Sequence, residues 1–315
     1  MAEMRGYRRT LLGLWLAGAV AAVVYASGQQ IPWPVAAAVA PAFLLELSFY
    51  LIPGFEDVRR RFTHPAALVA SAVAPYAVYS LGTGVFRWSS MALVALLAAA
   101  VVFWFRALPR GPFADLGFLA LMSGVYLAKA FHPLYPSPTP DLDLHVLGQL
   151  MWIRLGLSTV MAFRPMEGVG FGFMPQRRDW LIGLRHFLYF LPVGLALIMV
   201  FGTMRFQPAP GLWWKIPATF VGILWVVALG EEFFFRGLLQ QWLSSWLGSW
   251  AGLALASLLF GAVHLPFRFF PNWKFAAVAA VAGWFYGRAF LAGGGIRASM
   301  VTHALVVTTW RTLLG

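Results

Sequence analysis

The chain contains no cysteine, and this absence excludes several kinds of chemistry. Disulfide bonds, thiolate metal sites and cysteine nucleophiles are all removed at once. Asparagine is almost as scarce, since Asn272 is the only one in the sequence. Any hydrolytic site in this protein must therefore rely on carboxylates, imidazoles, guanidinium groups or hydroxyls.

Charge is also scarce, because Asp, Glu, Lys and Arg make up only 11% of the residues while 61% are hydrophobic. A soluble domain carries about 25% charged residues. Apolar segments near the ~20 residues that cross a bilayer as a helix recur along the whole chain. They fall near residues 11–27, 33–53, 65–81, 89–107, 115–132, 144–163, 180–202, 213–240, 249–264, 274–291 and 298–314. The sequence therefore predicts an all-α, polytopic transmembrane helical bundle with about eleven spans.

The 23 Lys and Arg residues outnumber the 11 Asp and Glu residues, but they are not gathered into a nucleic-acid-binding patch. They lie mostly in short clusters on alternate loops, at residues 5–9, 59–61, 106–110 and 164–178. The positive-inside rule then places the N-terminus in the cytoplasm and, after eleven crossings, the C-terminus on the opposite side. We expect a multi-pass protein of a prokaryotic cytoplasmic membrane, in contact with lipid. The first segment begins like a cleaved signal peptide, but the close return of the second favours an uncleaved span.

A charged, glycine-containing connection between residues 164 and 179 divides the sequence. Residues 1–165 form an N-terminal transmembrane helical half that is nearly inert chemically, and we expect it to serve structure or partner contact. The groups suited to chemistry are concentrated in the last third of the chain. We therefore predict a catalytic transmembrane domain over residues 166–315.

Two adjacent carboxylates, Glu231 and Glu232, lie in an apolar helical segment with Arg236 one turn later. Ionisable groups at membrane depth are costly, so their presence there indicates a function. Glu232 and Arg236 are four residues apart and share a helix face, so the arginine can hold that carboxylate ionised. Glu231 points about 100° away and is available as a general base. The alternative is a structural ion network at a helix end.

Two histidines occur in other apolar spans of the same region. His264 follows Phe260 by four residues and precedes the helix-breaking Pro266, while His303 follows a glycine run. Either histidine alone is more typical of a structural residue. Their conjunction with Glu231 and Glu232 instead predicts one polar cavity inside the bundle, open toward the cytoplasm.

The order Glu-Glu-x-x-x-Arg, Phe-x-x-x-His and His-x-x-x-Asn resembles the CAAX prenyl protease and bacteriocin-processing (Abi) family. Its members are glutamate-dependent intramembrane endopeptidases related to the Ras-converting enzyme, and the resemblance covers roughly residues 170–315. It implies that Glu231 and His264 activate the attacking water, and that Glu232 and Arg236 support and orient the catalytic groups. It further implies that His303 stabilises the tetrahedral oxyanion, that no cofactor is needed, and that the substrate is a membrane-associated peptide or protein, prenylated in the family.

One position departs from the family pattern, because Val307 stands where the asparagine is expected. Valine cannot donate a hydrogen bond, and loss of one oxyanion donor typically costs about 10²–10³ in rate. Ser299, one turn before His303, and Thr308 are the hydroxyls that can substitute. The departure puts ordinary activity and the usual substrate in question more than the fold.

Three other interpretations stay open. Glu231, His264 and His303 could bind zinc with an open fourth position, although the family resemblance and the absence of a His-Glu-x-x-His pair favour metal-free chemistry. The same three groups could relay protons in a transporter. A non-enzymatic immunity or scaffold relative is the third alternative, and Val307 favours it. Replacing Glu231 with glutamine separates these functions.

Overall fold

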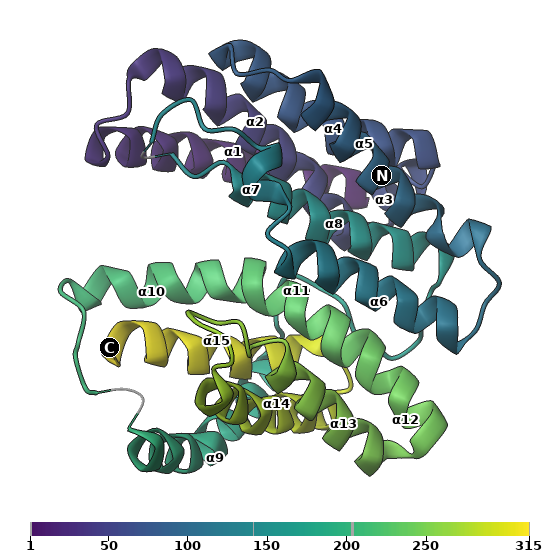
Figure 1. Cartoon of the computed structure of the whole chain (residues 1–315), viewed down its shortest axis with the longest axis vertical. Helices are drawn as coiled ribbons and strands as arrows, with labels where there is room; N and C mark the ends of the chain where they lie inside the picture. The colour runs from purple at the N-terminus through teal and green to yellow at the C-terminus, as the bar shows by residue number, and fades with distance from the viewer. Residues whose placement is uncertain (1, 141, 203–204, 315) are drawn as a thin grey trace. The chain divides into compact units, whose positions relative to one another are not determined.

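A computed structural model describes residues 2–140, 142–202 and 205–314, and these residues are almost entirely helical with no β-strand among them. They separate into two compact units, residues 1–165 and 166–315, whose helices are shown in Figure 1. The all-α class predicted from composition is confirmed. The roles assigned to the two halves stay predictions.

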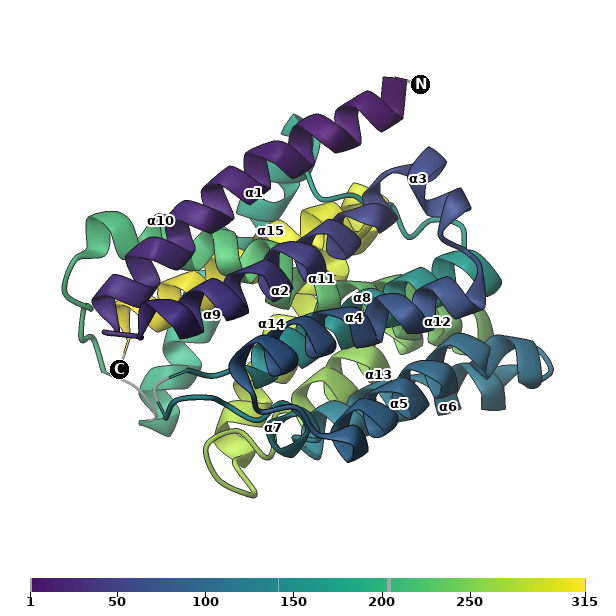
Figure 2. The same ribbon diagram turned by 90° about the horizontal axis from the view of Figure 1, so that it is seen from above.

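The N-terminal unit is built from six longer helices, with α2 packed on both α1 and α4, α4 on α5, and α8 on α2, α4 and α5 (Figure 2). These helices are α1 (Ala2–Gly28), α2 (Trp33–Leu51), α4 (Pro65–Thr83), α5 (Trp88–Ala107), α6 (Pro112–Leu127) and α8 (His145–Phe163). Three short helical segments complete the unit: η1 (Ile52–Gly54), α3 (Glu56–Arg61) and α7 (Phe131–Leu134). Proline in the first turn of α2, α4 and α6 suits helix starts, where its missing N–H is not needed.

A buried ion pair lies inside this unit. Arg154 Nε donates to Glu46 Oε1 at 2.7 Å and Nη2 to Oε2 at 3.2 Å. The same guanidinium donates to the Ser71 hydroxyl at 2.9 Å and to the Ser71 carbonyl at 3.3 Å. The pair thus joins α2, α4 and α8, and every one of the bonds lies in the apolar interior.

The C-terminal unit begins with α9 (Arg177–Phe201), followed by a continuous helical rod from Leu212 to Leu247. The rod consists of α10 (Leu212–Gly222), the π-helical η2 (Ile223–Ala228), α11 (Leu229–Glu232), the π-helical η3 (Phe233–Gln240) and α12 (Gln241–Leu247). Three further helices follow: α13 (Ser249–Ala262), α14 (Trp273–Gly293) and α15 (Ile296–Leu313). α14 packs against α9, α13 and α15.

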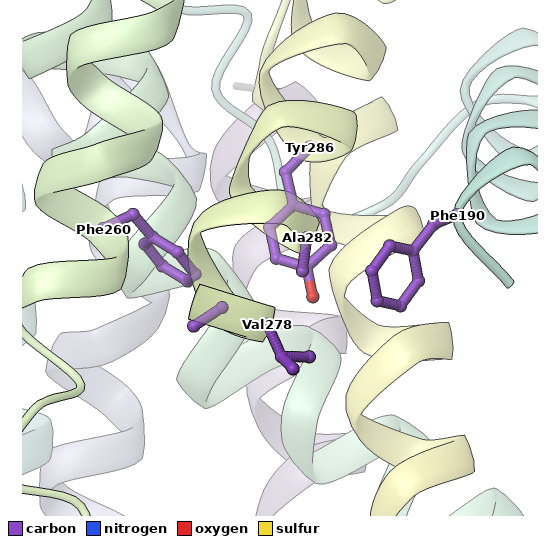
Figure 3. Packing of buried hydrophobic residues seen from close by; sticks show 6 residues of the cluster. Phe190, Phe260, Val278, Ala282 and Tyr286 are labelled. Carbon is purple, nitrogen blue, oxygen red and sulfur yellow. The ribbon is translucent and has the colours of Figure 1, made fainter. Parts of the chain in front are cut away.

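The core of this unit surrounds α14. Phe190 of α9 and Phe260 of α13 approach α14 from opposite sides, against Val278, Ala282 and Tyr286 (Figure 3). α14 ends at Gly294, whose φ of 70° is the left-handed conformation that glycine adopts without strain. The glycine run that precedes His303 in the sequence therefore forms the turn between α14 and α15.

Each of the eleven predicted apolar segments forms a helix. Within the described residues, eight helices or helical rods are long and apolar enough to cross a membrane, judged by length and composition. α6 and α13 are apolar but shorter, at 16 and 14 residues, and α15 carries Arg297, His303 and Arg311. The chain is thus polytopic, and the count of eleven full crossings stays a prediction.

Candidate active site

The two adjacent carboxylates lie between two π-helical segments of the rod. α11, which ends with Glu231 and Glu232, is only four residues long and is bounded by η2 and η3. π-helical turns are rare in proteins, and those that occur are often found at functional sites. The Glu232 side chain is fully buried, whereas 33% of the Glu231 side chain is exposed. The two carboxyl groups therefore lie in different environments, although they are neighbours in sequence.

The predicted pair of Glu232 with Arg236 is formed. Arg236 Nε lies 3.4 Å from Glu232 Oε2, and both side chains are buried. Arg236 Nη2 also donates to the Gly283 carbonyl of α14 at 2.9 Å. Its guanidinium lies 4.5 Å from the centre of the Phe260 ring and 5.4 Å from that of Tyr286. Arginine stacked in this way is fixed in position and keeps its charge next to Glu232.

His303 of α15 joins the two carboxylates. Its Nδ1 lies 2.8 Å from Glu232 Oε1, and its Nε2 lies 3.8 Å from Glu231 Oε2. An ionised Glu232 can only accept, so His303 Nδ1 carries the proton of that hydrogen bond. The second nitrogen then faces Glu231, as a lone pair in the neutral ring or as a donor in the imidazolium. Glu232 thereby sets which end of the imidazole is available for chemistry.

Two aromatic rings hold the imidazole of His303. The Tyr286 ring of α14 stacks almost parallel to it, with centroids 4.5 Å apart and an angle of 13°. Phe260 of α13 meets it edge to face at 5.9 Å. Sequence reasoning missed α14, because Tyr286 lies in no catalytic motif.

A signal for α14 was nevertheless present in the sequence, since Gly283 and Gly287 are four residues apart in an apolar helix, a spacing typical of close helix contact. A Cβ atom at Gly283 would lie 3.1 Å from Arg236 Nη2, and one at Gly287 would lie 2.5 Å from Gln240 Oε1. Both glycines therefore let α14 approach the rod that carries the carboxylates.

His264 lies in the turn after α13, and the ring of Phe260 contacts both His264 and His303. His264 Nδ1 is 2.7 Å from the Phe260 carbonyl, so Nδ1 donates and Nε2 of the neutral ring is an acceptor. Its ring packs on Phe260 and on Phe275. In the part of the chain that the structure describes, no hydrogen bond or ion pair joins His264 to Glu231. A direct His264–Glu231 contact is therefore absent, and their joint action requires a water molecule between them.

The two hydroxyls considered as substitutes for the family asparagine lie in different places. Ser299 is buried near Glu232, and its hydroxyl donates to the Ile296 carbonyl at 2.9 Å. Thr308 lines an apolar cavity between α9, α10 and α15. Ser299 thus lies near the carboxylate cluster, whereas Thr308 faces a separate region.

The zinc interpretation needs His264 to join Glu231 and His303. Among the described residues, no group of three or more His, Asp or Glu side chains is placed to hold a metal ion. The donor arrangement therefore gives no support to a zinc centre built from these three residues.

The part of the chain that carries this cluster matches a protein-family model. Residues 213–309 match the family described as type II CAAX prenyl endopeptidase Rce1-like. These residues form an Rce1-like domain. It includes Glu231, Glu232, Arg236, His264 and His303, so the family resemblance read from the three motifs is confirmed. Searches of curated proteins and of solved structures found no match. The match begins within α10, so α9 lies before the matched residues.

Proposed function

We propose that this integral membrane protein is an endopeptidase that hydrolyses a peptide bond in a membrane-associated substrate. The observation that carries the proposal is the cluster in which His303 joins a buried Glu232 and a partly exposed Glu231. The Rce1-like family supports a CAAX-type protease at the family level.

Glu231 is proposed as the general base, because its carboxylate is the partly exposed one. It takes a proton from water while the water oxygen attacks the substrate carbonyl carbon. The protonated Glu231 then gives this proton to the amine nitrogen as the C–N bond breaks. His264 presents an acceptor nitrogen and would hold the same water.

His303 is proposed to stabilise the tetrahedral intermediate. Its Nδ1 is committed to Glu232, so only Nε2 can donate to the oxyanion, and the ring must then carry both protons. Arg236 keeps Glu232 ionised, and Tyr286 and Phe260 hold the imidazole. A positioned donor of this kind contributes about 10²–10³ in rate.

The substrate class follows from the family rather than from the cluster. We propose a C-terminal peptide or protein segment anchored in the membrane, of the prenylated CAAX type or a related one, and a prokaryotic cytoplasmic membrane as the location. The apolar helices around the site favour a substrate that reaches it from the lipid phase.

Hydrolysis of a fluorogenic farnesylated CAAX peptide by the full-length protein in lipid nanodiscs tests the proposal. We expect turnover that persists with strong chelators and is abolished by Glu231→Gln or His264→Ala. Glu56→Gln, the same exchange at an exposed carboxylate of α3, serves as the matched control. Chelator inhibition reversed by zinc would contradict the metal-free mechanism. An unchanged cellular function of Glu231→Gln would indicate a scaffold protein, and proton-coupled uptake in vesicles a transporter.

A further inference from the structure

An apolar cavity of about 380 Å³ lies between α9, α10 and α15, away from the carboxylate cluster. Six of the residues that line it are Trp180, Ile216, Phe220, Leu305, Thr308 and Leu313. On α15 the lining residues run from 305 to 313, eight residue steps that correspond to about 12 Å along the helix. The cavity is therefore a groove elongated along the axis of α15, a shape that fits a hydrocarbon chain.

The direction of this groove follows from two contacts of α15. The Ala209 N–H, just before α10, donates to the Thr312 carbonyl at 2.8 Å. Farther along the rod, Glu232 meets His303. α10 and α15 are thus antiparallel, with the start of α10 beside the end of α15. At the far end of the groove, Trp180 stacks on Phe220 with ring centroids 5.8 Å apart.

Thr308 lines the groove together with Thr309 and Thr312. Thr308 is only 5% exposed, and its hydroxyl has no hydrogen-bond partner among the described residues. Thr302 and Thr312 on the same helix return their hydroxyls to the carbonyl four residues earlier, at 3.2 and 2.8 Å. A buried hydroxyl without a hydrogen-bond partner is unfavourable. Thr308 is therefore placed to bond a polar group of a molecule in the groove.

The start of α10, beside one end of the groove, carries residues typical of a membrane interface. Trp213 and Trp214, at the start of α10, are 84% and 49% exposed. The Lys215 ammonium lies 5.7 Å from the centre of the Trp214 ring, and the next residue, Ile216, lines the groove. Tryptophan and lysine together at a helix end are typical of headgroup level. A cation there complements a lipid phosphate.

We propose that this groove binds one anionic phospholipid of the surrounding bilayer. The phosphate pairs with Lys215, an ester carbonyl accepts a hydrogen bond from Thr308, and one acyl chain lies along α15 toward Phe220. The order of the three features along the groove matches the order of the parts of the lipid. The site does not depend on peptidase activity, because it shares no side chain with the carboxylate cluster.

Lipid binding to the full-length protein tests this proposal directly. Native mass spectrometry with phosphatidylglycerol, compared with phosphatidylcholine, should show one retained anionic lipid. We expect Lys215→Gln and Thr308→Val each to weaken retention about fivefold, the effect of one interfacial charge or one hydrogen bond. Thr309→Phe, which fills the groove, should abolish it.

Three matched variants serve as controls. Thr219→Val makes the same exchange on α10 outside the lining, Leu258→Phe adds an aromatic ring at an exposed site of α13, and Lys274→Gln removes another lysine at a helix start. All three should retain the lipid, and their unfolding temperatures identify any variant that fails to fold. Wild-type retention by Thr309→Phe, or equal retention of the two lipids, would overturn the proposal. Binding of a farnesylated peptide in the groove, with no retention of phosphatidylglycerol, would assign the groove to the substrate instead.

Discussion

The two units each bury an arginine–glutamate pair, and the pairs differ in how completely their hydrogen bonds are satisfied. In the N-terminal unit, Arg154 makes four hydrogen bonds to Glu46 and Ser71. In the C-terminal unit, Arg236 Nε and Glu232 Oε2 face each other at 3.4 Å as an ion pair without a hydrogen bond, and Arg236 Nη1 has no hydrogen-bond partner among the described residues. An ion pair whose hydrogen bonds are satisfied stabilises a fold, whereas a buried polar group that lacks hydrogen bonds is placed to bind another molecule.

Breaking the saturated pair should give the largest effect on stability. Arg154→Met leaves Glu46 buried and unpaired, and such a loss typically costs about 3–5 kcal/mol. We expect a lower unfolding midpoint in detergent titrations. The double replacement Glu46→Leu with Arg154→Met should recover most of the loss, because no charge is left behind. A stable single variant would contradict a structural role for the pair.

A new hydrogen-bond donor beside His303 should raise the rate of peptide turnover. Val307→Asn supplies the amide that the family pattern places four residues after His303. If the oxyanion lacks a second donor, turnover of the peptide should rise by up to about 10²–10³. Val306→Asn, at the neighbouring position that packs on the core, is the control and should not gain. A folded Val307→Asn protein that is no faster would show that another donor, such as Ser299, already acts.

Removing the aromatic ring that stacks on His303 should have a smaller effect on the rate of turnover. Tyr286→Leu removes the parallel ring at 4.5 Å and should lower kcat about tenfold, near the ~1.4 kcal/mol upper range for an aromatic pair. Tyr286→Phe keeps the ring and should stay within about twofold of wild type. A merely structural ring would lower both the unfolding temperature and the folded fraction without changing the pH profile of kcat. Equal rates for Leu and Phe would rule out positioning through the ring.

Much of this arrangement could be predicted from local sequence. The eleven helices follow from apolar runs, and the Glu232–Arg236 pair follows from four-residue spacing. The contacts that span long stretches of chain could not be predicted in the same way. His303 meets Glu232 from 71 residues away, and Tyr286 stacks on His303 only because two glycines of α14 allow close approach. The π-helical turns around Glu231 were also unexpected, since no residue pattern specifies them.

The contrast between the structural Glu46 of the N-terminal unit and the proposed catalytic Glu231 of the C-terminal unit is tested most directly by the same exchange in each unit. Glu231→Gln and Glu46→Gln, prepared in identical nanodiscs, should be compared for turnover of the farnesylated peptide per folded molecule and for unfolding temperature. We expect Glu231→Gln to remove turnover while the unfolding temperature stays within about 2 °C, the shift that a fraction of a kcal/mol gives. We expect Glu46→Gln to lower the unfolding temperature while turnover of the folded fraction is unchanged. Persistent turnover in Glu231→Gln, or inactive but stable Glu46→Gln protein, would contradict the account.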